Sequence, residues 1–199
     1  MLPKGLTEIL ESADYVDWDF SFRNINLSTD LLQVEFSIND TEGSNEKSIV
    51  LMKISGKTDF FIAKKDNSGY SHFEDQHPLL WRFSDTQCEL YITGQTKKVK
   101  ELAFDLFNIH YSLFGQYISF NPGVLTSINN GHGLFQKGPK LLLKMYADKL
   151  NEYGIKTSII SERPPDKILS NLKILFLGSS YFIGNNFEFE VLMGKTHSK

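Results

Sequence analysis

The chain of 199 residues has a single cysteine, few arginines and no long apolar run, and each of these absences excludes something. With Cys88 as the only cysteine, no disulfide can form within the chain, which fits a reducing compartment. No stretch approaches the roughly 20 apolar residues of a membrane span, and residues 1–8 lack the apolar run of a signal peptide. We therefore expect a cytoplasmic protein of bacterial type with no membrane partner.

Arginine occurs only at positions 23, 82 and 163, and the formal net charge is −3. Nucleic-acid binding of the strongly basic kind needs clustered lysine and arginine, so a nucleic-acid partner is not expected. Residues 1–46, however, carry ten carboxylates against two cations, a net charge of −8. The ten are Glu8, Glu11, Asp14, Asp17, Asp19, Asp30, Glu35, Asp40, Glu42 and Glu46. This block predicts an acidic face that attracts a basic partner protein, with ordinary solvation of exposed surface as the alternative.

Large apolar side chains are plentiful, with 41% hydrophobic residues and 16 phenylalanines, so the chain can bury a sizeable core. In residues 15–23, apolar side chains alternate with polar ones, which is typical of a half-buried strand. Alternation or short apolar runs predict further strands at 33–38, 49–52, 60–63, 79–83 and 88–93, and closing strands at 155–160, 174–177 and 187–191.

Two helices separate these groups of strands. Residues 97–114 place apolar side chains and His110 on one stripe, and this helix is expected to lie on the sheet. The second helix begins at Pro139, which fits a first helical position, and ends before Gly154, which suits a left-handed cap. We therefore predict a single α+β domain over residues 1–199, predominantly antiparallel, with about six N-terminal strands, two main helices and about three C-terminal strands.

The segment 129–140 leads glycine-rich backbone into the start of the second helix. Free N–H groups and the helix dipole favour an anion at such a place. Gly133 and Gly138 have the spacing of a phosphate-binding loop, but Pro139 and Lys140 stand where that motif needs Lys and Ser or Thr. A tight turn that positions Pro139 is the structural alternative. The candidate anion- or partner-binding residues are Asn130, Gly131, His132, Gly133, Lys137 and Lys140.

Other groups of reactive residues match no catalytic or metal-binding motif. Residues 72–77 hold two histidines and two carboxylates, but their spacing fits no compact metal site. His110 is either a hydrogen-bonded core residue or a general base with a shifted pKa. Cys88 lacks a cysteine–histidine signature, and no Gly-x-Ser-x-Gly motif is present. We therefore expect no metal and no cofactor, and we assign no catalytic residue.

These observations favour a non-catalytic protein-binding module, for example a toxin-neutralising immunity protein, whose acidic face recognises a basic partner. The alternative is an enzyme, or a small-ligand- or anion-binding protein, with its site around the 129–140 loop. The alternative requires a deep pocket beside that loop, with His110 or His132 near a carboxylate. The binding module requires carboxylates to gather on one surface.

Overall fold

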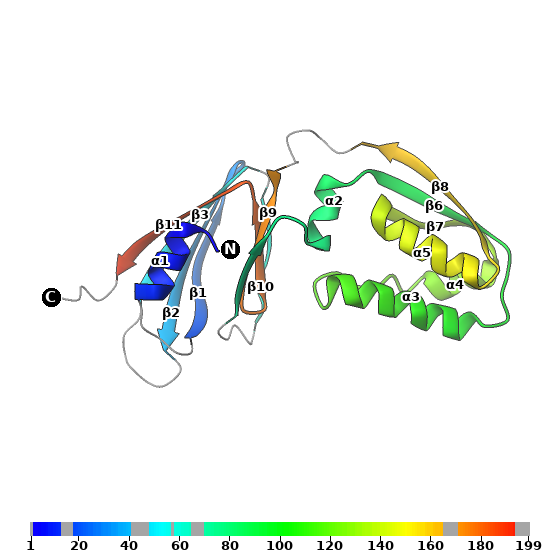
Figure 1. Cartoon of the computed structure of the whole chain (residues 1–199), viewed down its shortest axis with the longest axis horizontal. Helices are drawn as coiled ribbons and strands as arrows, with labels where there is room; N and C mark the ends of the chain where they lie inside the picture. The colour runs from blue at the N-terminus through cyan, green and yellow to red at the C-terminus, as the bar shows by residue number, and fades with distance from the viewer. Residues whose placement is uncertain are drawn as a thin grey trace. The chain divides into compact units, whose positions relative to one another are not determined.

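The computed structural model describes residues 2–12, 18–40, 48–56, 58–64, 70–164 and 171–193, and within them the chain is an α+β protein (Figure 1). Its strands form three sheets in which every pair is antiparallel, which confirms the predicted fold class. The chain divides into two compact units: unit 1 is Met1–Gln76 with Asn171–Lys199, and unit 2 is His77–Ser170. That residues 1–199 act as one domain stays a prediction, and each unit is described on its own.

Unit 1 contains two four-stranded sheets and one helix. Sheet A has the strand order β1-β2-β3-β11, and sheet B has the order β4-β10-β9-β5. The elements are α1 (Lys4–Ser12), β1 (Trp18–Leu27), β2 (Leu31–Asp40), β3 (Ser48–Ser55), β4 (Asp59–Phe61), β5 (Ser71–Glu74), β9 (Lys173–Leu177), β10 (Ser180–Gly184) and β11 (Asn186–Met193). β1 and β2, whose alternation predicts strands, pair as an antiparallel hairpin closed by a 2.9 Å hydrogen bond from the Ser28 N–H to the Leu31 carbonyl.

The core of unit 1 joins its two sheets. Alternate residues of β2 and β3 are fully buried, and they meet Leu175, Leu177 and Phe182 from sheet B. Helix α1 adds three apolar side chains to the same core. A Cβ atom at Gly184 would overlap Cγ2 of the buried Ile54, so glycine is what allows β10 to approach β3 this closely.

Unit 2 is a three-stranded sheet with its helices on one side (Figure 1). Sheet C has the order β7-β6-β8. The elements are η1 (Pro78–Leu80), α2 (Trp81–Ser84), β6 (Gln87–Thr93), α3 (Val99–Phe114), α4 (Val124–Asn130), β7 (His132–Pro139), α5 (Lys140–Glu152) and β8 (Lys156–Arg163). Helix α5 packs on all three strands, whereas α3 packs on α4, α5 and η1. The expectation that the first long helix lies on the sheet is therefore wrong, because α5 occupies that layer.

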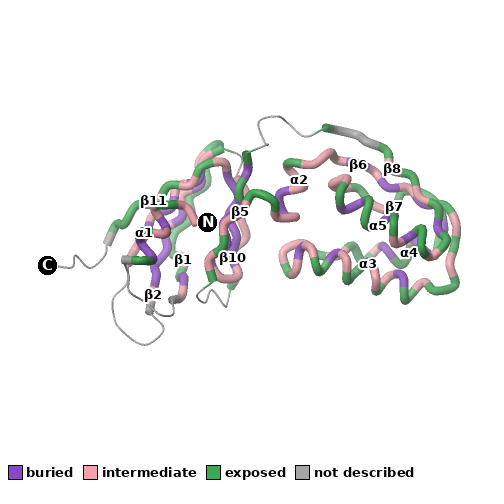
Figure 2. Tube along the Cα trace, viewed as in Figure 1, coloured by how far each residue is buried: buried purple, intermediate pink, exposed green. Residues whose placement is uncertain are grey.

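Buried and exposed positions alternate along α3 and α5 as helical periodicity predicts (Figure 2). Gly154 has a φ of +80°, so it ends α5 in the left-handed conformation that the sequence indicates. In the part of the chain that the structure describes, no helix is long and apolar enough to cross a membrane.

Two local predictions are wrong. Residues 79–83, predicted as a strand, form η1 and α2, where Pro78 takes the first helical turn and Nδ1 of His77 accepts a hydrogen bond from the Leu79 N–H. A short apolar run fits a buried helix as well as a strand, so periodicity alone could not decide. The 129–140 segment is not a loop: it is the end of α4, the strand β7 and the first residue of α5.

Candidate functional site

The six residues predicted to bind an anion or partner are spread along one strand. Asn130 ends α4, Gly131 is its left-handed cap, and Lys140 begins α5. The eight residues of β7 between them span roughly 25 Å at normal strand rise. Nδ1 of the His132 ring lies 2.9 Å from the carbonyl oxygen of Asn130, two residues away. The structure therefore does not gather the six residues at one point.

The start of α5, where the sequence predicts an anion, holds a carboxylate of the chain itself. Oδ2 of Asp85 accepts the Leu141 N–H at 2.7 Å, and Oδ1 accepts the Thr86 N–H at 2.8 Å. The Lys140 N–H donates to the Thr86 carbonyl at 2.9 Å. A carboxylate here satisfies free N–H groups and complements the helix dipole. The helix start therefore attracts an anion as predicted, and the Asp85 carboxylate is that anion.

Beside β7, unit 2 has a partly open cavity of about 150 Å³. Its wall is formed by η1, α2, α3, the 115–123 connection, α4, β7 and α5, and most of the side chains are apolar or aromatic. The lining residues are Pro78, Leu79, Arg82, His110, Phe114, Ile118, Ser119, Phe120, Asn121, Val124, Gln136, Lys137, Pro139, Leu142 and Tyr146. Of the six predicted residues, Lys137 alone takes part. A pocket lined by His110 therefore lies next to the predicted segment, but the carboxylate that the ligand-binding alternative also requires is not among its described lining residues.

His110 is the buried polar group of this cavity, with 6% of its surface exposed. Its Nε2 lies 2.9 Å from the Ile118 carbonyl oxygen, which can only accept, so Nε2 carries a proton. Its Nδ1, 2.8 Å from Oη of Tyr146, accepts the tyrosine proton when the ring is neutral. The histidine thereby ties α3 to the 115–123 connection and to α5.

Burial keeps both His110 and Tyr146 uncharged. Desolvation lowers the pKa of His110, although the hydrogen bond to Ile118 acts in the opposite direction. Desolvation also raises the pKa of Tyr146 far above its ordinary value. Near neutral pH, the pair is therefore an uncharged imidazole and an uncharged phenol. No carboxylate is among the described residues of the lining, so the arrangement offers hydrogen bonding rather than acid–base catalysis.

Most of this cavity was not predictable from the sequence. His110 was a candidate from the sequence, but Tyr146 has no signal beyond its place on the apolar stripe of α5, and Arg82 lies in a segment predicted as a strand. Ser119, Phe120 and Asn121 come from the connection between α3 and α4, which carries no motif. A usable signal was the rarity of arginine: one of three arginines stands within the apolar run 79–83.

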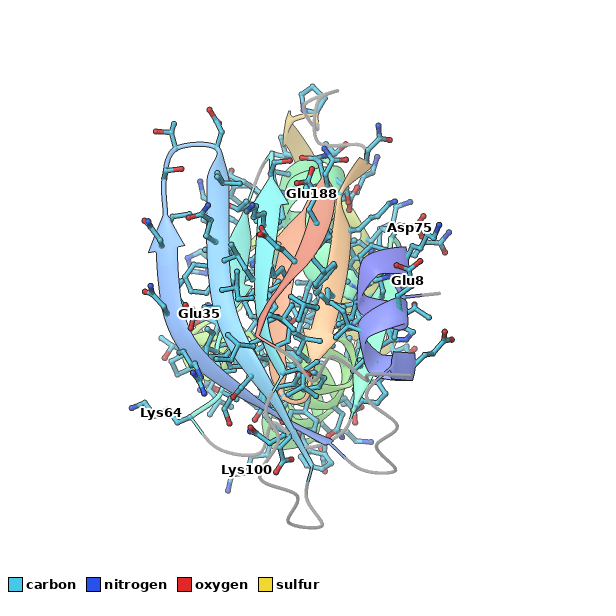
Figure 3. The ribbon with its side chains drawn as sticks, turned by 90° about the vertical axis from the view of Figure 1, so that its left-hand side faces the viewer. Glu8, Glu35, Lys64, Asp75, Lys100 and Glu188 are labelled. Carbon is cyan, nitrogen blue, oxygen red and sulfur yellow. The ribbon has the colours of Figure 1, made fainter. Side chains whose placement is uncertain are left out.

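The carboxylates of unit 1 gather in part on the outer face of sheet A, which is the face turned away from the core. Glu35 of β2 and Glu188 of β11 are two of these carboxylates (Figure 3). By register, Glu35 and Glu190 are both opposite Leu51, and Glu188 is opposite Lys53. Lys53 pairs with Glu190 at 3.0 Å. Glu8 and Glu11 lie on α1 instead, and Asp14, Asp17, Glu42 and Glu46 fall outside the described residues. The carboxylates of residues 1–46 are thus divided between α1 and sheet A. The sheet register places two further carboxylates, from β11, beside Glu35.

Residues 72–77 do not form a metal centre in the described chain. Nε2 of His72 lies 3.3 Å from Glu74, and His77 caps η1. Among the residues described, no group of three or more histidine, cysteine or acidic side chains is placed to hold a metal. Cys88 is buried.

Comparison with known proteins adds no functional information. The chain matches no family model, no curated protein and no solved structure. Function is therefore argued from the cavity and the charged face alone.

Proposed function

We propose that this protein binds a small ligand without transforming it, in the cavity of unit 2. The observation that supports this proposal is a mostly apolar hollow of about 150 Å³ that contains one buried, hydrogen-bonded histidine. An apolar pocket with a few convergent polar groups and perturbed pKa values is the usual form of a ligand site.

The size of the cavity limits the ligand to about one ring. An apolar cavity of about 150 Å³ in another protein accommodates benzene. Protein interiors are close-packed, and cavities of this size lower stability unless something fills them. A hollow of this volume beside a satisfied polar pair therefore fits a binding role better than a packing role.

Binding is tested with phenol as the probe, followed through the backbone amide signals of the ¹⁵N-labelled protein. We expect a dissociation constant on the order of 0.1–10 mM for so small a ligand, with shifts centred on the cavity lining. Leu142→Trp should abolish the shifts, because this buried side chain lines the cavity. Ser119→Trp places the blocking ring at an exposed position of the lining. It should also abolish the shifts, without disturbing the core.

Leu141→Trp is the matched control. Leu141 is next to Leu142 on α5, but it is 46% exposed and does not line the cavity. Binding that survives in both blocking variants, or shifts that scatter over unit 1, would contradict the proposal.

The second candidate is the protein-binding module, favoured by Glu35, Glu188 and Glu190 on the outer face of sheet A. Lys53 is in register with Glu188 and forms an ion pair with Glu190. An acidic surface speeds association with a basic partner. In unit 1 we propose this face as the recognition surface.

The test is a pull-down of basic proteins from a lysate of the cells that produce the chain. It compares the wild type with a triple variant in which Glu35, Glu188 and Glu190 are replaced by glutamine. The wild type should retain one basic partner in a salt-dependent way, and the triple variant should lose it. A variant with Glu8 and Glu11 changed to glutamine removes two charges of α1 and should keep the partner. Equal capture by all three proteins would rule out recognition through this face.

A further inference from the structure

Resting on the proposed function, we propose that the ligand of the unit 2 cavity is an uncharged single-ring aromatic compound of the phenol type, whose hydroxyl group donates a hydrogen bond to Oη of Tyr146. Three features of the cavity support this ligand class: the direction of its buried hydrogen bonds, the lack of charge at its buried end and its aromatic walls.

The hydrogen bonds of the buried pair run in one direction. The Ile118 carbonyl oxygen can only accept, so Nε2 of His110 is the donor at 2.9 Å. The neutral ring then has one acceptor, Nδ1, and the Tyr146 hydroxyl donates to it at 2.8 Å. The only proton of that hydroxyl is therefore used, and the remaining lone pair of Oη can only accept. A ligand that meets this oxygen must bring a donor.

Oη of Tyr146 can take such a donor. Among the residues that the structure describes, its hydrogen bond to His110 is the one that this hydroxyl forms. Both side chains line the cavity, and both are buried. The two amide side chains of the lining, Asn121 and Gln136, hydrogen-bond to each other at 2.9 Å instead. Hydrogen bonds that form a chain polarise one another, so a further donor at Tyr146 strengthens the chain that ends at Ile118.

The buried end of the cavity favours an uncharged ligand. Burial lowers the pKa of His110 and raises the pKa of Tyr146, so both groups are neutral near pH 7. A charged group against this pair would lose its hydration while facing an uncharged partner. The Lys137 ammonium of the lining is paired with the Glu89 carboxylate. A phenolic hydroxyl has an ordinary pKa of about 10, so near pH 7 it supplies a donor without a charge.

The walls favour a flat ring. The His110 ring centre lies 4.9 Å from that of Phe114 and 5.5 Å from that of Phe120, at interplanar angles of 53° and 59°. Aromatic rings pair best in such tilted or edge-to-face arrangements, so a planar ligand ring extends the cluster. An aliphatic alcohol of equal volume would fill the space without these contacts.

The experiment compares two matched pairs of ligands by the amide titration at about pH 7.5. Phenol has a hydroxyl where toluene has a methyl group, and anisole has an ether oxygen, which only accepts, where ethylbenzene has a methylene group. We expect phenol to bind within about fivefold of toluene, because Tyr146 replaces the hydrogen bond that phenol loses to water. Anisole should bind more than about fivefold more weakly than ethylbenzene, because its oxygen meets the lone pair of Tyr146.

His110→Phe tests the direction of the chain. This variant keeps a ring in the wall and releases the Tyr146 proton, which can then be donated to an acceptor. Anisole should gain at least about threefold relative to ethylbenzene, whereas a merely loosened cavity would change both affinities alike. His132→Gln is the matched control, because it replaces an exposed histidine that does not line the cavity, and it should leave both ratios unchanged.

The outcomes separate the two proposals. If phenol binds more than about fivefold more weakly than toluene, or anisole binds within about fivefold of ethylbenzene, the ligand class is wrong and the ligand-binding function stands. This comparison uses the wild type, so it decides even if His110→Phe fails to fold. If His110→Phe has the circular dichroism spectrum of the wild type but leaves the anisole ratio unchanged, the assignment of Tyr146 is wrong. If none of the four compounds binds in the cavity, both proposals are overturned.

Discussion

Replacing Phe36 with alanine is expected to lower the free energy of unfolding of unit 1 by about 3–5 kcal/mol, the usual cost of removing a buried phenylalanine. Phe36 has no exposed surface, and its ring contacts those of Phe20 and Phe22 at centroid distances of 5.9 and 6.1 Å. Alanine would leave a hollow between the sheets that these neighbours cannot close. Urea unfolding followed by circular dichroism measures the change.

Leu27→Ala on β1 is the control for Phe36→Ala. Its side chain is 58% exposed, so the free energy of unfolding should change by no more than about 0.5 kcal/mol. A loss below about 1 kcal/mol for Phe36→Ala would show that the core described for unit 1 is wrong.

The same variant tests the prediction of a single domain. In a chain that also carries Trp18→Phe, Trp81 is the only tryptophan, and it belongs to unit 2. One cooperative domain requires the Trp81 fluorescence transition to shift with that of unit 1. An unmoved Trp81 transition would show that the two units unfold independently.

Replacing His110 with phenylalanine is expected to lower the free energy of unfolding by about 1–3 kcal/mol at pH 7.5, the cost of leaving buried polar groups without partners. The substitution keeps a ring in the aromatic cluster but removes both hydrogen bonds of the imidazole, to Tyr146 and to Ile118. Urea unfolding of both proteins gives the difference. A variant as stable as the wild type would show that neither bond contributes to stability.

His110 should also give the wild type a distinct pH dependence. Burial lowers its pKa in the folded state below the ordinary value of 6.5, so below that pH the unfolded chain binds the extra proton. The stabilisation is therefore complete above about pH 6.5 and is lost as the pH falls below it, with a slope of at most about 1.4 kcal/mol per pH unit.

His110→Phe should remove this component of the pH dependence between about pH 7 and pH 5. His132→Gln is the matched control and should keep it, because this variant replaces an exposed histidine of unit 2 and leaves His110 in place. If the free energy of unfolding depends on pH with the same slope in His110→Phe and the wild type, then His110 titrates alike in the folded and unfolded chains.

Patterns that one element carries by itself were predictable from the sequence. The alternation in β1 and β2, the periodicity of α3 and the glycine end of α5 each depend on residues within a few positions of one another. The structure confirms these elements, since burial of one face is the force that selects both the period and the register. The predicted start of α5 is wrong by one residue, because Pro139 has extended backbone and is the N-cap rather than the first helical residue. Local patterns did not distinguish a helix from a strand at 79–83, where the apolar run is too short.

The position of the candidate functional residues was decided by the tertiary structure. β7 could not be predicted because Gly133 and Gly138 interrupt the alternation, and its backbone groups become paired only when β6 lies beside them. The acidic face depends on the pairing of β3 with both β2 and β11, which are far apart in the sequence.

The sequence by itself determined the α+β class, the antiparallel character of the sheets and the limits of the main helices, because these follow from hydrophobic periodicity and from capping residues. Only the tertiary structure placed Arg82, His110 and Tyr146 around one cavity. Those three residues come from α2, α3 and α5, and their contacts arise from packing between elements, which has no period in the sequence.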